Sequence, residues 1–259
     1  MNIFNHQSGR YLNVDTANLY FEVAGTPAKP ALLILHGSLG NLEEVNPILV
    51  KLAKRYTLIA IDSRGHGKST MGASRLTYER LQKDAELVLQ HLNIASLSIL
   101  GFDDGGVVAC RMAAYSKLKI DRVVTIGSRW HYKNADSSRI ALKSMFNEGW
   151  KERFSAMYEN YQSLNPEPDA ELLVQALVKM WLDPGASGYP SFNLQRYIAP
   201  LLMIRGDKDP VVSAAALVEL AALLPNAIFF NVPFAGHNAH TQQKEMIILA
   251  LEEFFRKVS

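Results

Sequence analysis

The stretch SLSILGFDDGGVVAC, residues 96–110, restricts the fold of this chain more than any other feature. An apolar run leads into a glycine-rich turn and a helical pattern starts at Val107, so we expect a buried strand, a tight turn and a helix. Gly101 and Gly105 flank Asp103 with the spacing G-x-S-x-G, in which a strained turn lifts the middle side chain clear of a sheet. Glycines are needed because such a turn crowds its neighbours. Here the middle residue is an aspartate instead of a serine.

Strand and helix signals alternate along most of the chain. The expected strands are 11–14, 19–24, 31–35, 56–61, 97–100, 122–126, 201–205 and 227–232. The expected helices are 45–55, 77–92, the segment from Val107, 170–181, 214–224 and 241–258. Buried strands that alternate with helices predict an α/β fold with a mostly parallel sheet covered on both faces. The first two strands are expected to form an antiparallel hairpin at the sheet edge.

Residues 128–198 depart from this alternation, because they hold helical stretches and several prolines but no strand signal. That segment contains the three tryptophans of the chain, Trp130, Trp150 and Trp181. A helical insertion between two strands of a parallel sheet is expected to form a cap over the active edge of the sheet. We therefore predict a core domain of residues 1–127 and 199–259 and a helical cap of residues 128–198.

Composition limits the kinds of partner. The 259 residues and the 48% hydrophobic content suffice for one domain with a large core. Lys and Arg total 27 against 25 for Asp and Glu, without a basic cluster interleaved with aromatic residues, so we expect no nucleic-acid or membrane partner. The start of the chain lacks the features of a secretion signal, and the single cysteine, Cys110, can form no intrachain disulfide. We expect a cytoplasmic monomer or weak homodimer that acts on a small molecule.

Chemically active side chains gather where the expected strands end, which is where parallel sheets bind ligands. Asp207 and Asp209 follow one strand and His237 follows the last one. Asp103, Asp209 and His237 have the chain order of a nucleophile, an acid and a histidine, in which the acid fixes the tautomer of the imidazole. Asp209 is preferred to Asp207 as the acid. No metal or cofactor is expected, because no carboxylate or cysteine lies at ligand spacing from the histidine.

The loop after the strand at 31–35 is the second part of the predicted site. Its Ser38 follows a His-Gly pair, and the backbone N–H of Ser38 is expected to form an oxyanion hole together with the backbone N–H of Asp104. Asp104 also follows the turn residue directly, so its carboxylate is a candidate cap for the helix.

Together these motifs resemble the α/β-hydrolase fold superfamily, and within it the biphenyl-hydrolase-like (valacyclovir hydrolase) esterases. The matching segments are 36–40 (HGSLG), 101–106 (GFDDGG), 206–210 (GDKDP) and 236–240 (GHNAH). The resemblance covers nearly all of the chain outside the cap and implies hydrolysis of a small-molecule ester. It implies that Asp104 binds an amino group of the substrate, and hence an aminoacyl ester. Leu39 and the three tryptophans are further candidates for substrate contacts.

Asp103 departs from that pattern, because the esterases have serine there. A carboxylate that attacks an ester gives an anhydride, which is a poor route to hydrolysis. Asp nucleophiles in the superfamily belong to dehalogenases and epoxide hydrolases, where the carboxylate displaces a leaving group at an sp³ carbon and the histidine then activates water. Those families follow the nucleophile with Trp or Arg, whereas Asp104 follows here, and Tyr158 and Tyr161 are the candidate acids for an epoxide.

Several interpretations of Asp103 therefore stay open. The chain is an esterase scaffold in which Asp103 reduces or silences turnover, or it is an Asp-nucleophile hydrolase of C–halogen or epoxide bonds. Asp103 as a general base towards water, and a non-catalytic homologue that binds a small ligand, are the remaining alternatives.

Overall fold

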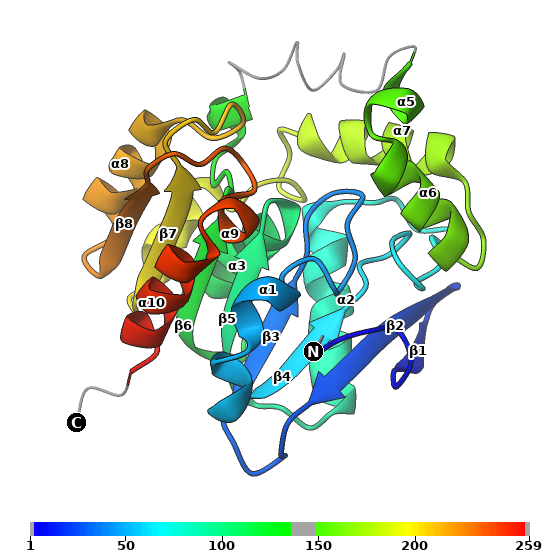
Figure 1. Ribbon diagram of the computed structural model, residues 1–259, viewed down its shortest axis with the longest axis horizontal. Coiled ribbons are helices and arrows are strands. Elements are labelled where there is room, and N and C mark those ends of the chain that lie inside the picture. Colours follow the sequence, from blue (N-terminus) through cyan, green and yellow to red (C-terminus); the bar gives the residue numbers. More distant parts are fainter. Residues whose placement is uncertain (1–2, 136–148, 257–259) are drawn as a thin grey trace.

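The computed structural model describes residues 3–135 and 149–256, and the sheet of this part has eight strands in the order β1-β2-β4-β3-β5-β6-β7-β8 (Figure 1). The strands are β1 (Arg10–Val14), β2 (Ala17–Ala24), β3 (Ala31–Leu35), β4 (Thr57–Ile61), β5 (Ser96–Phe102), β6 (Lys119–Ile126), β7 (Leu201–Gly206) and β8 (Ala227–Val232). β2 pairs antiparallel with β1 and β4, and all other neighbours are parallel. The predicted mostly parallel sheet with an antiparallel hairpin at its edge is confirmed.

Helices cover both faces of this sheet. They are α1 (Asn46–Leu49), α2 (Tyr78–His91), α3 (Asp104–Tyr115), α5 (Trp150–Arg153), α6 (Ser155–Leu164), α7 (Ala170–Trp181), α8 (Ala214–Leu223), α9 (Ala239–Gln242) and α10 (Lys244–Phe254). Side chains of α2, α3 and α8 belong to one hydrophobic core, and side chains of α1 and α10 belong to another. Successive residues of a strand point to opposite faces, so Leu33 lies in the first core and Leu32 and Ile34 lie in the second.

Two expected helices are divided in the structure. The segment 45–55 forms α1 and a separate 3-10 turn, Leu52–Lys54. The closing segment 241–258 forms α9 and α10, which are separated at Gln243, where φ is −133° and ψ is 48°. This break allows α9 to bury His240 near the site while α10 packs Ile247 against the sheet. The expected end of that helix, at residue 258, lies outside the described residues.

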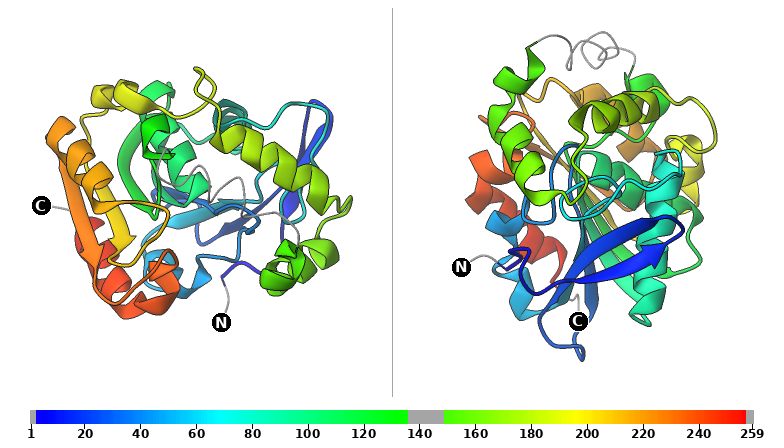
Figure 2. Two further views of the ribbon diagram at one scale, coloured as in Figure 1. Left: turned by 90° about the horizontal axis from the view of Figure 1, so that it is seen from above. Right: turned by 90° about the vertical axis from the view of Figure 1, so that its right-hand side faces the viewer.

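The described part of the segment between β6 and β7 consists of helices and loops without a strand, and residues 136–148 of the expected cap lie outside the described part. α5, α6 and α7 lie beyond the carboxyl ends of the strands, on one side of the molecule (Figures 1 and 2). The side chain of Asn165 attaches this segment to the rest of the chain by donating hydrogen bonds to the carbonyls of Gly67 and Ser69, both at 2.9 Å. The division into a core and a cap stays a prediction. In the described part, no helix has the length and apolar character needed to cross a membrane.

The turn between β5 and α3 packs directly on the end of β3. A Cβ atom at Gly105 would lie 2.3 Å from the backbone oxygen of Leu35 and 2.6 Å from that of His36. Only glycine fits such a close approach between two backbones. This contact sets the distance between the turn that carries Asp103 and the loop that carries Ser38.

We expect Gly105→Ala to lower the free energy of unfolding by about 1–3 kcal/mol, because one backbone must move to accept the methyl group. Gly236→Ala is the matched control, since the nearest atom to its Cβ would be a side-chain oxygen of Gln242 at 3.6 Å. We expect the control to stay within about 0.5 kcal/mol of the parent in urea denaturation. Equal stability of the two variants would contradict this account of the turn.

Candidate functional site

Asp103 occupies the strained position of the turn between β5 and α3. Its φ of 46° and ψ of −116° lie in a region that L-residues rarely adopt. Three backbone hydrogen bonds hold this conformation. The N–H of Asp103 donates to the carbonyl of Ile126 at 2.9 Å, and its carbonyl accepts from Gly106 at 3.0 Å and Val107 at 3.2 Å. The turn therefore presents the Asp103 side chain to the carboxyl edge of the sheet, as the sequence predicts.

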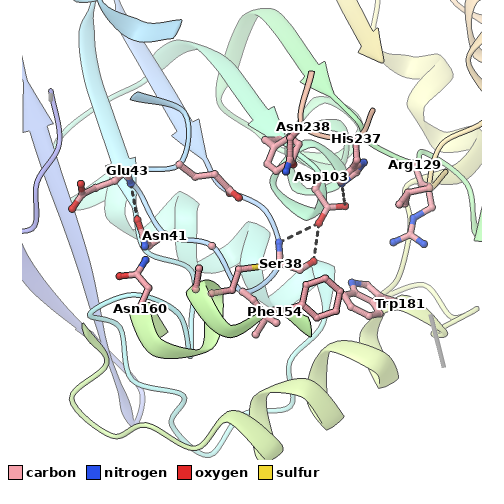
Figure 3. Close-up of a pocket in the computed structure, with 17 residues that line it drawn as sticks. Ser38, Asn41, Glu43, Asp103, Arg129, Phe154, Asn160, Trp181, His237 and Asn238 are labelled. Carbon is pink, nitrogen blue, oxygen red and sulfur yellow. Dashed lines mark hydrogen bonds and ion pairs between the residues drawn. The ribbon is translucent and has the colours of Figure 1, made fainter. Parts of the chain in front are cut away.

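The structure brings Asp103, His237 and Asp209 together, although they come from three different loops. Nδ1 of His237 lies 3.1 Å and 3.2 Å from the two carboxylate oxygens of Asp209. Nε2 of the same ring lies 3.6 Å from Oδ1 of Asp103 (Figure 3). Oδ1 of Asp209 also accepts the backbone N–H groups of Val211 and Val212, which fix the orientation of this carboxylate. The imidazole is thus held between two carboxylates.

The charges of this cluster stabilise one another. Burial lowers the pKa of His237, but the hydrogen bonds and charges of Asp103 and Asp209 outweigh burial and raise this pKa to about 10. Burial raises the pKa of Asp103, but His237, Arg129 and Ser38 outweigh it and hold this pKa below its ordinary value. At neutral pH an ionised Asp103 therefore faces an imidazolium ion.

Ser38 distinguishes the two oxygens of Asp103. The backbone N–H of Ser38 donates to Oδ2 of Asp103 at 3.1 Å, and its hydroxyl lies 2.8 Å from the same oxygen. The hydroxyl also lies 2.6 Å from Oδ2 of Asp104. A serine hydroxyl has one hydrogen, so it donates to only one of the two carboxylates at a time. Oδ2 of Asp103 is therefore held by Ser38, and Oδ1 is turned towards His237.

Asp104 is buried, and its carboxylate accepts hydrogen bonds from side chains of distant segments. Its carboxylate accepts a hydrogen bond from the hydroxyl of Tyr78 at 2.6 Å. The indole N–H of Trp181 lies 2.8 Å and 3.0 Å from the two oxygens of the same carboxylate. Burial and the negative charge of Asp103 raise the pKa of Asp104 to about 6. The contact with a substrate amino group that the resemblance implies is not supported by this arrangement, and the role of the Asp104 backbone N–H stays a prediction.

A cavity of about 560 Å³ opens at this cluster (Figure 3). The described residues that line it are Ser38, Leu39, Gly40, Asn41, Glu43, Glu44, Phe102, Asp103, Arg129, Phe154, Ala156, Met157, Asn160, Trp181, Val211, His237 and Asn238. The structure describes no group of three or more His, Cys, Asp or Glu side chains that could hold a metal ion.

Of the predicted substrate contacts, Leu39 and Trp181 are among the described lining residues, whereas Trp130 and Trp150 are not. Trp130 is buried and donates its indole N–H to the carbonyl of Ala216 at 2.8 Å. Trp150 is also buried and contacts the ring of Tyr158 edge-on, with the ring centroids 5.8 Å apart. Both side chains belong to a hydrophobic core of the described structure.

Three ionisable residues of the cavity, Glu43, Glu44 and Arg129, are absent from the sequence-based prediction. Arg129 is 2% exposed and follows β6, so the rule that strand ends carry functional residues could have found it. Glu44 accepts the backbone N–H of Gly37 at 2.8 Å, and burial raises its pKa to about 7. Glu44 lies in a polar stretch where nothing distinguishes it from Glu43.

The comparisons with known proteins agree with this geometry. Residues 30–178 match the family model described as the alpha/beta hydrolase fold. The chain is 28% identical to the serine hydrolase BPHL of Mus musculus, over 94% of this chain and 84% of that protein. It is 22% identical to the esterase YbfF of Escherichia coli, over 86% of this chain and 92% of that protein.

Among solved structures, a hydrolase from Pseudomonas aeruginosa PA01 superposes with a TM-score of 0.77 at 22% identity, covering 98% of this chain and 100% of that chain. This likeness concerns the fold, and the match to the family model spans more than half of the chain. The fold class and the resemblance predicted from the sequence are thus confirmed, and the chain belongs to the α/β-hydrolase fold family.

Proposed function

We propose that Asp103 is a nucleophile that displaces a halide from a saturated carbon of a small substrate, and that water then hydrolyses the resulting ester. The observation that carries this proposal is the difference between the two oxygens of Asp103. Oδ2 accepts donors from Ser38, whereas Oδ1 lies 3.6 Å from the imidazole of His237. A carboxylate held at one oxygen keeps the other oxygen available for attack.

In the first step, Oδ1 attacks the carbon from the side opposite the halogen. The new C–O bond forms while the carbon–halogen bond breaks, and the halide leaves with the electron pair. No proton is needed, so the protonated state of His237 does not hinder this step. The low pKa of Asp103 keeps the nucleophile ionised over the whole neutral range.

In the second step, the ester at Asp103 no longer carries a negative charge. The pKa of His237 then falls, because one of the two carboxylates that raise it has been neutralised. The neutral imidazole takes a proton from water, and the hydroxide attacks Cγ of Asp103. Negative charge develops on Oδ2 next to the N–H of Ser38, which would serve as an oxyanion hole. The bond between Cγ and the alkoxy oxygen breaks, and the leaving alkoxide takes the proton from His237 to form the alcohol. The new carboxyl group of Asp103 releases the remaining proton of the water to solvent, which restores the carboxylate.

The two tyrosines that the sequence offers as acids for epoxide opening lie away from the described lining of the cavity, which favours halide displacement over their use as acids. Ring opening of an epoxide produces an alkoxide, which needs an acid to protonate it. No tyrosine is among the described residues that line the cavity. Of the two candidate acids, Tyr158 contacts the ring of Trp150, and Tyr161 accepts the backbone N–H of Asp169 through its hydroxyl oxygen.

An ester hydrolase with reduced turnover is the second candidate. It is favoured by the similarity to proteins named a serine hydrolase and an esterase. In this case Asp103 stands where those enzymes have their serine, and Asp103→Ser would restore ester hydrolysis. The two candidates differ in whether the parent protein forms a covalent intermediate.

We expect His237→Gln to accumulate an ester at Asp103, because the second step loses its base while the first step does not. Intact-protein mass spectrometry after incubation with a panel of haloalkanes and halocarboxylic acids would show a mass increase equal to the alkyl group. Fragmentation would locate it on the peptide that contains Asp103. Turnover should fall by about 10²–10⁴-fold in this variant, measured as halide release.

Asp103→Asn is the matched control, since it keeps the shape of the side chain and removes the nucleophile. It should show no added mass under the same conditions. If the His237→Gln protein gains no mass with any member of the panel while Asp103→Ser hydrolyses p-nitrophenyl esters, the dehalogenase proposal is wrong and the silenced esterase is correct.

The same control tests the charge coupling. The pKa of His237 is raised to about 10 in the parent, with Asp103 and Asp209 both contributing. We expect Asp103→Asn to lower this pKa by more than one unit, towards the ordinary value near 6.5, as followed by NMR titration of the imidazole protons. Because a raised histidine pKa stabilises the fold below pH 6.5 and that contribution is lost as the pH rises towards 10, the parent should lose more stability than the variant over this range. Identical titration curves would rule out the coupling.

A further inference from the structure

The guanidinium of Arg129 is a buried cation at the cavity wall. The residue is 2% exposed and is one of the residues that line the cavity next to Asp103 (Figure 3). Its Nη1 atom is buried and has no hydrogen-bond partner in the described part of the chain. Its guanidinium carbon lies 5.8 Å from the centroid of the Tyr189 ring. A guanidinium nitrogen carries donors only, so this atom needs an acceptor.

The nearby carboxylates are paired with other residues, and neither accepts a hydrogen bond from Nη1 of Arg129. Asp103 is held by Ser38 and faces the imidazolium of His237. Asp104 accepts hydrogen bonds from Tyr78 and Trp181. Arg129 contributes its charge to both carboxylates, which explains why it is tolerated at this depth. It does not explain the unpaired Nη1, because a buried donor without an acceptor costs about 1–3 kcal/mol.

We infer that this cavity binds substrates that carry a carboxylate, and that Arg129 is the residue that holds the carboxylate. The inference rests on the proposed function, which places the reacting carbon of the substrate next to Asp103. It narrows the proposed substrates from halogenated compounds in general to short halogenated carboxylic acids. Guanidinium and carboxylate groups match in geometry, and a charge-assisted hydrogen bond would satisfy the unpaired Nη1. No bond to the carboxylate is made or broken in the reaction.

The cavity also has apolar lining that suits a short hydrocarbon chain. Leu39, Phe154, Met157, Val211 and Trp181 provide this apolar surface. The carboxylate of Asp104 is bonded to protein donors, so it does not favour a cationic substrate. The cavity therefore recognises an anion at Arg129 and offers a nucleophile at Asp103.

Binding of unreactive probes tests the inference without any turnover. Butyrate and butyramide have the same size and differ in charge, and neither contains a leaving group. By isothermal titration calorimetry at pH 7.5 we expect the parent to bind butyrate at least tenfold more tightly than butyramide. Arg129→Met should lower the affinity for butyrate about tenfold and leave the affinity for butyramide unchanged, and Arg129→Lys should recover part of the loss.

Equal affinity of the parent for the two probes would overturn the inference, and this comparison does not depend on whether a variant folds. A folded Arg129→Met protein that still prefers butyrate would also overturn it. Chloride that displaces butyrate at a concentration similar to the dissociation constant of butyrate would make Arg129 a halide site and would overturn it as well.

The outcomes separate this inference from the proposed function. If the parent prefers butyrate but the His237→Gln protein never gains an alkyl mass, the carboxylate site stands and Asp103 is not a nucleophile. If the alkyl mass forms only with uncharged haloalkanes and butyrate is not preferred, the nucleophile stands and the carboxylate site does not.

Discussion

The strained backbone of Asp103 is the constraint on which the rest of the site depends. A residue with φ of 46° persists only where neighbouring hydrogen bonds stabilise it, and here β6 and the first turn of α3 supply them. The close approach of Gly105 to the end of β3 then fixes how near the neighbouring loop can come. Ser38 can meet one oxygen of Asp103 because both contacts are in place, and His237 meets the other. The chemistry of the site follows from backbone packing at the edge of the sheet.

Most of the fold could be predicted from local patterns. All eight described strands coincide with expected apolar runs to within three residues at each end, and α7 occupies its expected range, 170–181. Strand ends also located Asp103, Asp209 and His237, since parallel strands deliver the residues that follow them to one edge. The division of the last helix at Gln243 could not be predicted, because the apolar spacing continues across a break that is imposed by tertiary packing.

The electrostatics of the site could not be predicted to the same extent. The effect of Arg129 depends on which carboxylates lie near it and on the burial of its side chain, and neither is visible in a sequence. The hydrogen-bond partners of Asp104 could not be predicted from the sequence either. The family resemblance implied a substrate contact for Asp104, whereas Tyr78 and Trp181 come from distant segments and occupy its oxygens. The roles of tryptophans are equally dependent on packing, since Trp130 and Trp181 differ only in where the rest of the chain places them.

The hydrogen bond between Trp181 and Asp104 joins the end of α7 to the turn that carries Asp103. Moving that end of α7 outward would leave the buried carboxylate of Asp104 without one of its donors. This hydrogen bond therefore holds the end of α7 against the turn. Phe154 directly precedes α6 and Met157 lies within it, and both line the cavity, with Met157 36% exposed. Trp181 lines the cavity and also completes the hydrogen bonding of Asp104, so a substitution there would change the cavity wall and the turn together.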